Sequence, residues 1–398
     1  MNCKHRIVVL GAGYAGAYTA GKLVRRLDPG DTEITVVNGE PDFVERLRMH
    51  QLATGQQIRA RKLADVFART GVRLRLAHVD AVDPARRAVS VTGGRGEEEI
   101  GYDTLVYALG SHIDDHGVPG VAEYAFDVAG RPSALRLRER LDGLAEGDPV
   151  LVVGGGLTGI ETAAEIAESR PGLPVTLVAG GALGDRLSPG ARRHLRETFR
   201  RLGITVREHT GAKAVEPARV LCADGTRLAS GATVWTAGFA VPPFAAAGGL
   251  QTTAGGRIVV DATMRSVSHP EVYAVGDSVY APDCNGRPLP MSCASAGSTS
   301  RQAVEAITAR LTGRPVPSTR LEYIGNHISL GRRDGIVQLV DDRARAKPGY
   351  MGGRKAARVK SGILKGALWS VSHPAIGRPK RRLRLAATPQ EHAGQNTS

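Results

Sequence analysis

The sequence is poor in the features that mark secreted and integral membrane proteins. Its four cysteines, Cys3, Cys222, Cys284 and Cys293, form no CxxC pair, so nothing indicates a disulfide scaffold or an oxidising compartment. No uninterrupted apolar run approaches the roughly 18 residues of a membrane-spanning helix. The apolar stretch near the N-terminus resembles part of a signal peptide, but the glycine motif described below explains it better. We therefore expect a cytoplasmic protein.

Acidic residues are missing from one long segment near the C-terminus. Residues 343–390 contain thirteen Lys or Arg and no Asp or Glu, in a chain whose net charge is +14. The remaining body is thus close to neutral, and only 4% of the residues are aromatic, which leaves little for stacking on bases. We expect no nucleic-acid partner. The basic tail suits contact with an anionic surface, and a solvated tail without any partner is the alternative.

The 398 residues predict two or three domains built around parallel sheets. A strand, a helix and a second strand are predicted over residues 5–11, 15–28 and 33–38. The same order recurs over residues 149–155, 158–169 and 173–179. Further strands and hairpins are predicted over residues 72–110, 220–238 and 271–277, followed by a helix near residues 295–311 and, after a break at 312–318, a third region that opens with a hairpin.

Each strand–helix–strand unit carries a Gly-x-Gly-x-x-Gly turn, GAGYAG at residues 11–16 and GGGLTG at residues 154–159. In such a turn the first glycine permits the tight bend, the second lets the backbone approach a pyrophosphate, and the third lets helix and strand pack closely. Glycine-rich loops without a nucleotide are the alternative. The sequence therefore predicts two dinucleotide sites, with candidate binding residues Gly11, Gly13, Gly16, Gly154, Gly156 and Gly159.

Neither unit has a carboxylate at the strand end where one usually binds the adenosine ribose. The first unit has Asn38 there, with Glu40 two residues later, and both are candidate binding residues. The second has Ala179, and Arg186 follows nearby. Loss of the carboxylate removes the charge that would repel a 2′-phosphate, but a neighbouring residue could restore a preference for NADH. The choice between NADH and NADPH stays open.

Four motifs in this order resemble the two-dinucleotide flavoproteins, which include type II NADH dehydrogenases and the pyridine nucleotide-disulfide oxidoreductases. The motifs are GAGYAG, TLVYALGS, GGGLTGIE and EVYAVGDS, and the resemblance covers residues 1 to about 316. It implies an α/β fold with two Rossmann-like domains, FAD in the first site and NADH or NADPH in the second. The implied domains are an FAD domain in two segments, 1–111 and 242–316, an NAD(P) domain at 112–241, and a C-terminal α+β cap at 317–398.

The resemblance also implies roles for single residues. Ala108, Gly110, Gly276 and Asp277 would contact the flavin cofactor, and Glu161 would lie on the nicotinamide side. Structural alternatives are a helix N-cap for Asp277 and a favourable charge in the first helical turn for Glu161. No metal site is indicated.

Residues 41–55 lie where type II NADH dehydrogenases have a segment of the form YQxATG over the flavin. His50 and Gln51 are therefore candidates for contact with the flavin or the acceptor, and the alternative is a helix with Leu47 and Leu52 packed inward. No cysteine pair follows the first fingerprint, as disulfide-reducing members have, although Cys284 and Cys293 could form a later pair. The glutamines expected near a quinone after the Asp277 motif are absent, which favours another acceptor.

Residues 355–371 have apolar residues at near-helical spacing, with Pro374 as a stop. Such a helix would lie at a membrane interface, as in type II NADH dehydrogenases, or pack on the body. Our main hypothesis is an FAD-dependent NAD(P)H oxidoreductase that passes electrons to a quinone-like acceptor without a redox disulfide, in the cytoplasm or peripherally at the inner face of the cell membrane. The alternatives are an enzyme acting on a soluble metabolite and a non-catalytic redox sensor. A homodimer is also left open.

Overall fold

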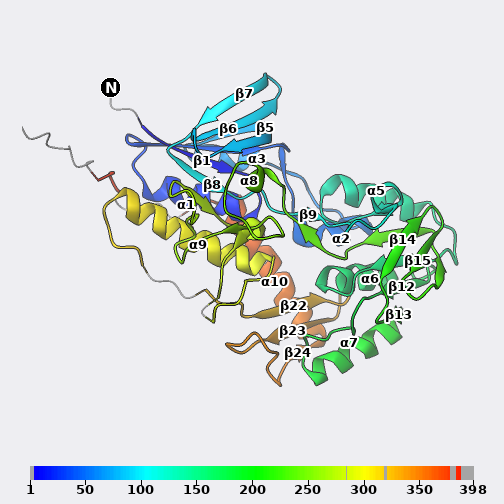
Figure 1. Cartoon of the computed structure of the whole chain (residues 1–398). Coiled ribbons are helices and arrows are strands. Elements are labelled where there is room, and N and C mark those ends of the chain that lie inside the picture. Colours follow the sequence, from blue (N-terminus) through cyan, green and yellow to red (C-terminus); the bar gives the residue numbers. More distant parts are fainter. Residues whose placement is uncertain (1–3, 284, 318–320, 377–381, 387–398) are drawn as a thin grey trace, which may run out of the picture.

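A computed structural model describes residues 4–283, 285–317, 321–376 and 382–386. Its largest sheet has seven strands in the order β20-β8-β1-β2-β5-β6-β7. The first five run parallel, and β5, β6 and β7 form an antiparallel ribbon at one edge (Figure 1). The strands are β1 His5–Leu10, β2 Thr32–Asn38, β5 Val72–Asp83, β6 Ala88–Gly93, β7 Gly96–Gly101, β8 Thr104–Tyr107 and β20 Val272–Ala274. The sheet thus joins strands from the start of the chain with one strand from residue 272 onward.

Two long helices pack side by side next to this sheet, α1 Tyr14–Arg26 and α9 Cys293–Leu311 (Figure 1). The predicted helix near 295–311 is confirmed as α9, and it begins two residues earlier because the Ser292 hydroxyl accepts a hydrogen bond from the backbone N–H of Ser295. Short elements complete this part: β3 Asp42–Phe43, α2 Met49–Ala53, β4 Arg61–Lys62, α3 Leu63–Phe67, α8 Phe244–Ala247, β19 Ile258–Val259 and β21 Val279–Tyr280, with 3-10 turns at Arg46–Arg48 and Gly276–Ser278.

The second sheet has five strands, all parallel, in the order β10-β17-β11-β12-β13. Its central strand β11 is buried along its whole length, as expected for a parallel strand covered on both faces. The strands are β10 Ala125–Phe126, β11 Val150–Val153, β12 Val175–Val178, β13 Thr205–Arg207 and β17 Ala232–Trp235. Helices α4 Val121–Tyr124, α5 Arg131–Asp142, α6 Leu157–Ser169 and α7 Pro189–Arg201 belong to this part, with a meander of β14 Ala212–Glu216, β15 Arg219–Cys222 and β16 Arg227–Ala229. The α/β fold with two Rossmann-like units is confirmed.

The chain crosses between the two sheets twice, and the crossing segments pair with each other as β9 His112–Ile113 and β18 Phe239–Ala240. These crossings lie beside the domain boundaries predicted at 111/112 and 241/242, and the boundaries themselves stay predictions. The two sheets have separate cores, yet Met49 and Leu52 of α2 are buried in the core of the second sheet.

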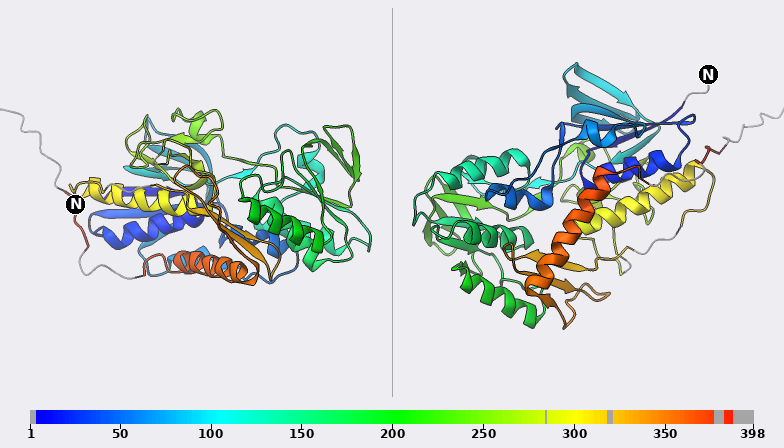
Figure 2. Two further views of the ribbon diagram at one scale, coloured as in Figure 1. Left: turned by 90° about the horizontal axis from the view of Figure 1, so that it is seen from below. Right: turned by 180° about the vertical axis from the view of Figure 1, so that it is seen from behind.

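The third region is a small antiparallel sheet followed by a long helix. The sheet consists of β22 Gly325–Ser329, β23 Gly335–Leu339 and β24 Met351–Gly352, and the predicted hairpin is confirmed as β22–β23. Ile328 and Ile336 from this sheet are buried in the second core. Helix α10, Gly353–Ser372, runs from the small sheet back to α1, where its residue Val371 is buried in the first core (Figure 2). The third region therefore contacts both halves of the molecule.

Candidate functional site

One cavity of about 1820 Å³ lies where the two sheets and the third region meet. Ligand pockets for a single drug-sized molecule are typically about 300–1,000 Å³, so this one has room for more than one ligand. Residues from all three parts of the chain line it, including Gly13 of the first fingerprint, Gly156 of the second and Lys360 of α10.

The first fingerprint forms the turn between β1 and α1. Gly11 has φ +93°, and a Cβ placed on it would lie 2.5 Å from the carbonyl oxygen of Ala108. A Cβ on Gly16 would lie 1.9 Å from the carbonyl oxygen of Gly11, so this glycine permits the helix to start against the strand. A Cβ on Gly13 would meet nothing within 4 Å, and Gly13 faces the cavity as the N-cap of α1. No side chain caps this helix, which leaves its first N–H groups for an anionic ligand.

The second fingerprint repeats this geometry between β11 and α6. Gly154 has φ +124° and packs against Thr236, with a built Cβ 2.6 Å from its atoms. A Cβ on Gly159 would again lie 1.9 Å from a carbonyl oxygen, that of Gly154, and one on Gly156 would meet nothing within 4 Å. Gly156 is the N-cap of α6 and faces the same cavity without a capping side chain. The two turns are therefore equivalent anion-binding cradles that open into one space.

At the end of β2, Asn38 holds the first fingerprint in place. Its Oδ1 accepts a hydrogen bond of 2.8 Å from the backbone N–H of Ala12, and its Nδ2 donates to the carbonyl oxygen of Glu40 at 2.7 Å. Asn38 and Glu40 both line the cavity, as do Ala108, Gly110, Gly276 and Asp277. The structure therefore brings these predicted residues together around the first fingerprint.

Arg46 is a residue at this site that the sequence did not reveal. Its Nη1 donates to the carbonyl oxygen of Ser111, while the Ser111 hydroxyl donates to Oδ2 of Asp277 at 2.7 Å. The Nη2 of Arg46 is buried and has no hydrogen-bond partner within the described residues. Burial lowers the pKa of Arg46, an effect that the charge of Asp277 opposes. A guanidinium with a free donor in a cavity wall fits a polar or anionic ligand group.

A second polar cluster lies where α6 meets α10. Glu161 forms an ion pair of 3.0 Å with Lys360 and accepts a 2.8 Å hydrogen bond from the backbone N–H of Ser329. Burial alone would raise the pKa of Glu161, but Lys360 and the other donors outweigh it and hold that pKa below its usual value. The carboxylate is thus ionised and paired at neutral pH. Lys360 also donates to the carbonyl oxygen of His327, a residue of the cavity wall.

His50 lies next to this cluster, on α2. Its side chain is only 4% exposed, it lines the cavity, and its Nε2 has no partner within the described residues. Burial lowers the pKa of His50, so its ring is neutral at neutral pH. A buried ring nitrogen without a partner fits a ligand that donates or accepts there.

Comparison with known proteins decides the family. The family model for pyridine nucleotide-disulphide oxidoreductases matches residues 5–303. The chain belongs to this family. An NADH dehydrogenase-like protein of Mycobacterium tuberculosis is 32% identical over 359 residues, covering 83% of this chain and 87% of that protein. Demethylphylloquinone reductase of Synechocystis is 27% identical over 353 residues, covering 84% and 87%.

Solved structures share the fold over almost the whole chain. NDH2 from Plasmodium falciparum, in complex with NADH, has a TM-score of 0.79 at 15% identity and covers 95% of this chain and 99% of that one. The sulfide:quinone oxidoreductase of Aquifex aeolicus has a TM-score of 0.78 at 19% identity, covering 94% and 92%. Within this family, cofactor sites are built on such glycine turns, and the open cradles at Gly13 and Gly156 fit FAD and a nicotinamide dinucleotide.

Gln51 and Cys293 are two further residues that the sequence analysis considered. Gln51 does not line the cavity, and its Oε1 accepts a hydrogen bond from Nε of Arg48 at 2.9 Å. Neighbouring helix positions are about 100° apart, so His50 faces the cavity and Gln51 does not. Cys284 lies outside the described residues. Cys293 lines the cavity, and burial raises the pKa of its thiol to about 11, so it is protonated at neutral pH.

Proposed function

We propose that this protein is an FAD-dependent NAD(P)H:quinone oxidoreductase. The observation that carries the proposal is that both fingerprints line one cavity, which brings two dinucleotide cradles together. When bound, the nicotinamide would supply a hydride, and the flavin would accept it and relay two electrons to the acceptor. The net reaction consumes NAD(P)H, one proton and a quinone, and yields NAD(P)⁺ and a quinol.

The chain's own residues would position and electrostatically tune this chemistry. We infer that Gly13 and Gly156 admit the two pyrophosphates, and that Asp277, Ser111 and Arg46 bind the flavin cofactor along its length. Glu161 and Lys360 keep a fixed, compensated charge pair in the cavity wall between the second fingerprint and α10. We infer that His50, whose Nε2 has no partner among the described residues, exchanges a hydrogen bond or a proton with the acceptor.

No redox disulfide is part of this proposal. Cys293 is protonated at neutral pH, and a thiol is a poor nucleophile compared with a thiolate. The demethylphylloquinone reductase among the relatives and the quinone oxidoreductase among the solved structures support a quinone as the acceptor.

The test is an anaerobic titration of the purified yellow protein. NADH or NADPH should bleach the flavin absorbance, and addition of a quinone should restore it within one turnover. A protein that binds no flavin, or whose flavin neither nucleotide bleaches, would refute the proposal. Bleaching without reoxidation by any quinone would instead favour a soluble metabolite as the acceptor.

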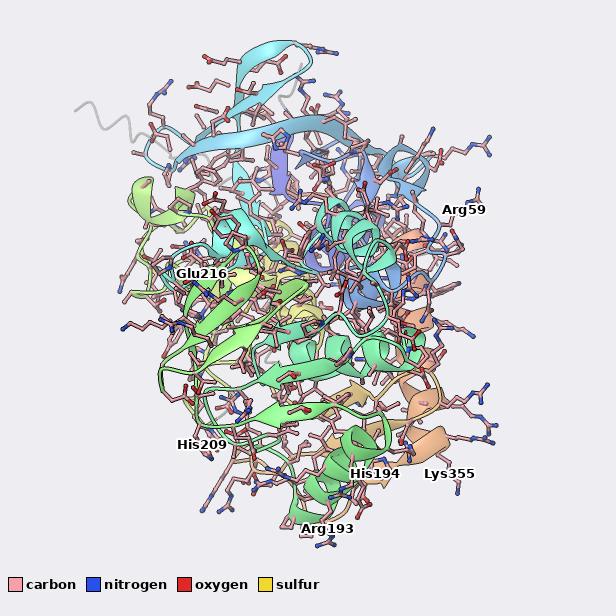
Figure 3. All side chains as sticks on the ribbon, turned by 90° about the vertical axis from the view of Figure 1, so that its right-hand side faces the viewer. Arg59, Arg193, His194, His209, Glu216 and Lys355 are labelled. Carbon is pink, nitrogen blue, oxygen red and sulfur yellow. The ribbon has the colours of Figure 1, made fainter. Side chains whose placement is uncertain are left out.

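We further propose a peripheral contact between α10 and an anionic membrane. Across the part of the chain that the structure describes, no helix is long and apolar enough to cross a bilayer. Val359, Ile363 and Trp369 of α10 are exposed, and basic side chains such as Lys355 lie on the same helix and extend outward (Figure 3). This mixture is typical of helices that lie in a membrane interface. Ile363 and Leu364 also line the cavity, so an apolar acceptor could enter beside this helix.

Flotation with vesicles tests the contact directly. The protein should bind vesicles that contain phosphatidylglycerol and lose that binding in the variant V359S/I363S. The matched control is L135S, because Leu135 is equally exposed on α5, far from α10. Equal binding of V359S/I363S and the native protein would exclude α10 as the contact.

A further inference from the structure

The loop that follows β12 forms the end of the cavity beside the second fingerprint. β12 ends at Val178, and Ala179, Gly180 and Gly181 then line the cavity. A Cβ built on Gly180 or Gly181 would meet nothing within 4 Å. The position at which dinucleotide sites usually place a carboxylate for the adenosine ribose is therefore apolar, and the space next to it is open.

The loop also brings positive charge to this end of the cavity. Arg186 lines the cavity, is exposed, and makes no hydrogen bond or ion pair with any described residue. A second guanidinium is fastened to the loop, since Nε of Arg192 donates to the carbonyl oxygen of Gly184 at 3.2 Å and its Nη2 to that of Asp185 at 3.0 Å. Two arginines thus stand against the loop that would surround the ribose.

The acidic groups nearby do not cancel this charge. Glu208 is already compensated, because it forms an ion pair with Arg196 and accepts a hydrogen bond from the backbone N–H of Leu183. Asp185 also lines the cavity and is the one acidic side chain of the loop. Two guanidinium groups against one carboxylate leave an excess of positive charge. An additional phosphate, which carries close to two negative charges at neutral pH, would complement this excess.

We propose that the nicotinamide site prefers NADPH to NADH, with Ala179 and Arg186 as the residues that determine this specificity. The inference rests on the proposed function, since it names the reductant of the same reaction. NADPH differs from NADH only in the 2′-phosphate on the adenosine ribose. Ala179 leaves room for that phosphate and does not repel it, and Arg186 supplies hydrogen-bond donors that no other described residue engages.

Two variants and two probes test the preference. A hydrogen bond to a charged group contributes about 1.5–3 kcal/mol, so R186Q should lower kcat/KM for NADPH by about 10- to 150-fold and affect NADH far less. A179E should lower kcat/KM for NADPH similarly and raise it for NADH, because the carboxylate repels the phosphate and binds the ribose hydroxyls. Independently of turnover, calorimetric titration of the native protein should show adenosine 2′,5′-bisphosphate binding at least about tenfold more tightly than AMP, and in R186Q the two should bind with similar affinity.

The matched control is R193Q. Arg193 is on the outer face of α7, does not line the cavity, and extends away from the body (Figure 3), so its loss removes the same charge without touching the site. Its ratio of kcat/KM for the two nucleotides should equal that of the native protein. An equal or lower kcat/KM for NADPH than for NADH, with both bleaching the flavin, would overturn this inference and leave the proposed function intact. Failure of both nucleotides to bleach the flavin would instead overturn the proposed function.

Discussion

The roles of the two fingerprints in flavin and nucleotide binding can be distinguished by one matched pair of substitutions, G13A and G156A. Both glycines are N-caps with negative φ, −68° for Gly13 and −73° for Gly156, so alanine fits the backbone at either position. A Cβ at either position would meet no protein atom within 4 Å. The ligand-free fold should therefore change in stability by no more than about 1 kcal/mol.

The substitutions should weaken binding only where a pyrophosphate must approach the backbone closely. Forcing a methyl group into a closely packed contact costs typically about 1–3 kcal/mol, which corresponds to roughly 5- to 150-fold in affinity. G13A should then purify with a reduced flavin content. G156A should remain fully yellow but require a correspondingly higher concentration of NADH or NADPH for reduction of the flavin.

Three measurements decide the outcome: the ratio of flavin to protein absorbance, the dependence of flavin bleaching on nucleotide concentration, and the urea midpoint of the flavin-stripped proteins. G16A and G159A serve as the contrasting pair, because their added Cβ would lie 1.9 Å from a carbonyl oxygen and should disturb the fold itself. If G156A lost flavin while G13A kept it, the assignment of the two cradles would be reversed. Unchanged binding in both variants would show that these turns hold no dinucleotide.

Three further predictions concern single contacts. K360M should lower the free energy of unfolding by about 3–5 kcal/mol, because it leaves Glu161 buried without its ion-pair partner, and the double variant E161Q/K360M should recover part of that loss in urea unfolding. Asp334 has a pKa that burial would raise but that His194 and Arg201 hold below its usual value. The contribution of Asp334 to stability is therefore fully present above the ordinary carboxyl pKa and is lost as the pH falls through the lowered one. D334N should thus cost about 1.5–3 kcal/mol at pH 7, and the difference from the native protein should shrink as the pH falls below the ordinary carboxyl pKa. C293S should retain quinone reduction, and the Cys293 thiol should react with iodoacetamide more slowly at pH 7 than free cysteine by mass spectrometry; a fast reaction or an inactive variant would contradict the absence of a redox disulfide.

The sequence was sufficient for features that follow local rules. Gly-x-Gly-x-x-Gly between a strand and a helix specifies backbone conformation within a few residues. In both turns a Cβ added to the third glycine would lie 1.9 Å from the carbonyl oxygen of the first. The hairpin at residues 325–339 and the helix at 353–372 follow from short turn signals and helical periodicity in the same way. Gly362 and Gly366 do not interrupt that helix, because its packing against the small sheet and α1 supports it.

The rest of the site depends on contacts between distant segments. Glu161 meets Ser329, 168 positions away, and no local pattern relates them. Arg46 sits among other charged residues in the sequence, which resembles a solvated surface, yet its guanidinium is buried beside Asp277. The sequence does contain an indication for Lys360, because this charged residue lies four positions before Leu364 and interrupts the apolar stripe of its helix. A charged residue on an apolar helix face requires a buried partner, and Glu161 is that partner.

The same position of Lys360 bears on how the C-terminal region can be studied. Val359 and Lys360 are neighbours on α10 but point about 100° apart, so one is exposed while the other reaches Glu161 in the cavity wall. A truncation before α10 would remove the exposed apolar side chains and the cavity wall together. Loss of quinone reduction in such a truncation would therefore not distinguish a lost membrane contact from a damaged site. V359S and K360M distinguish these two effects. V359S should weaken vesicle binding while quinone reduction assayed in detergent stays unchanged, and K360M should alter quinone reduction while vesicle binding stays unchanged.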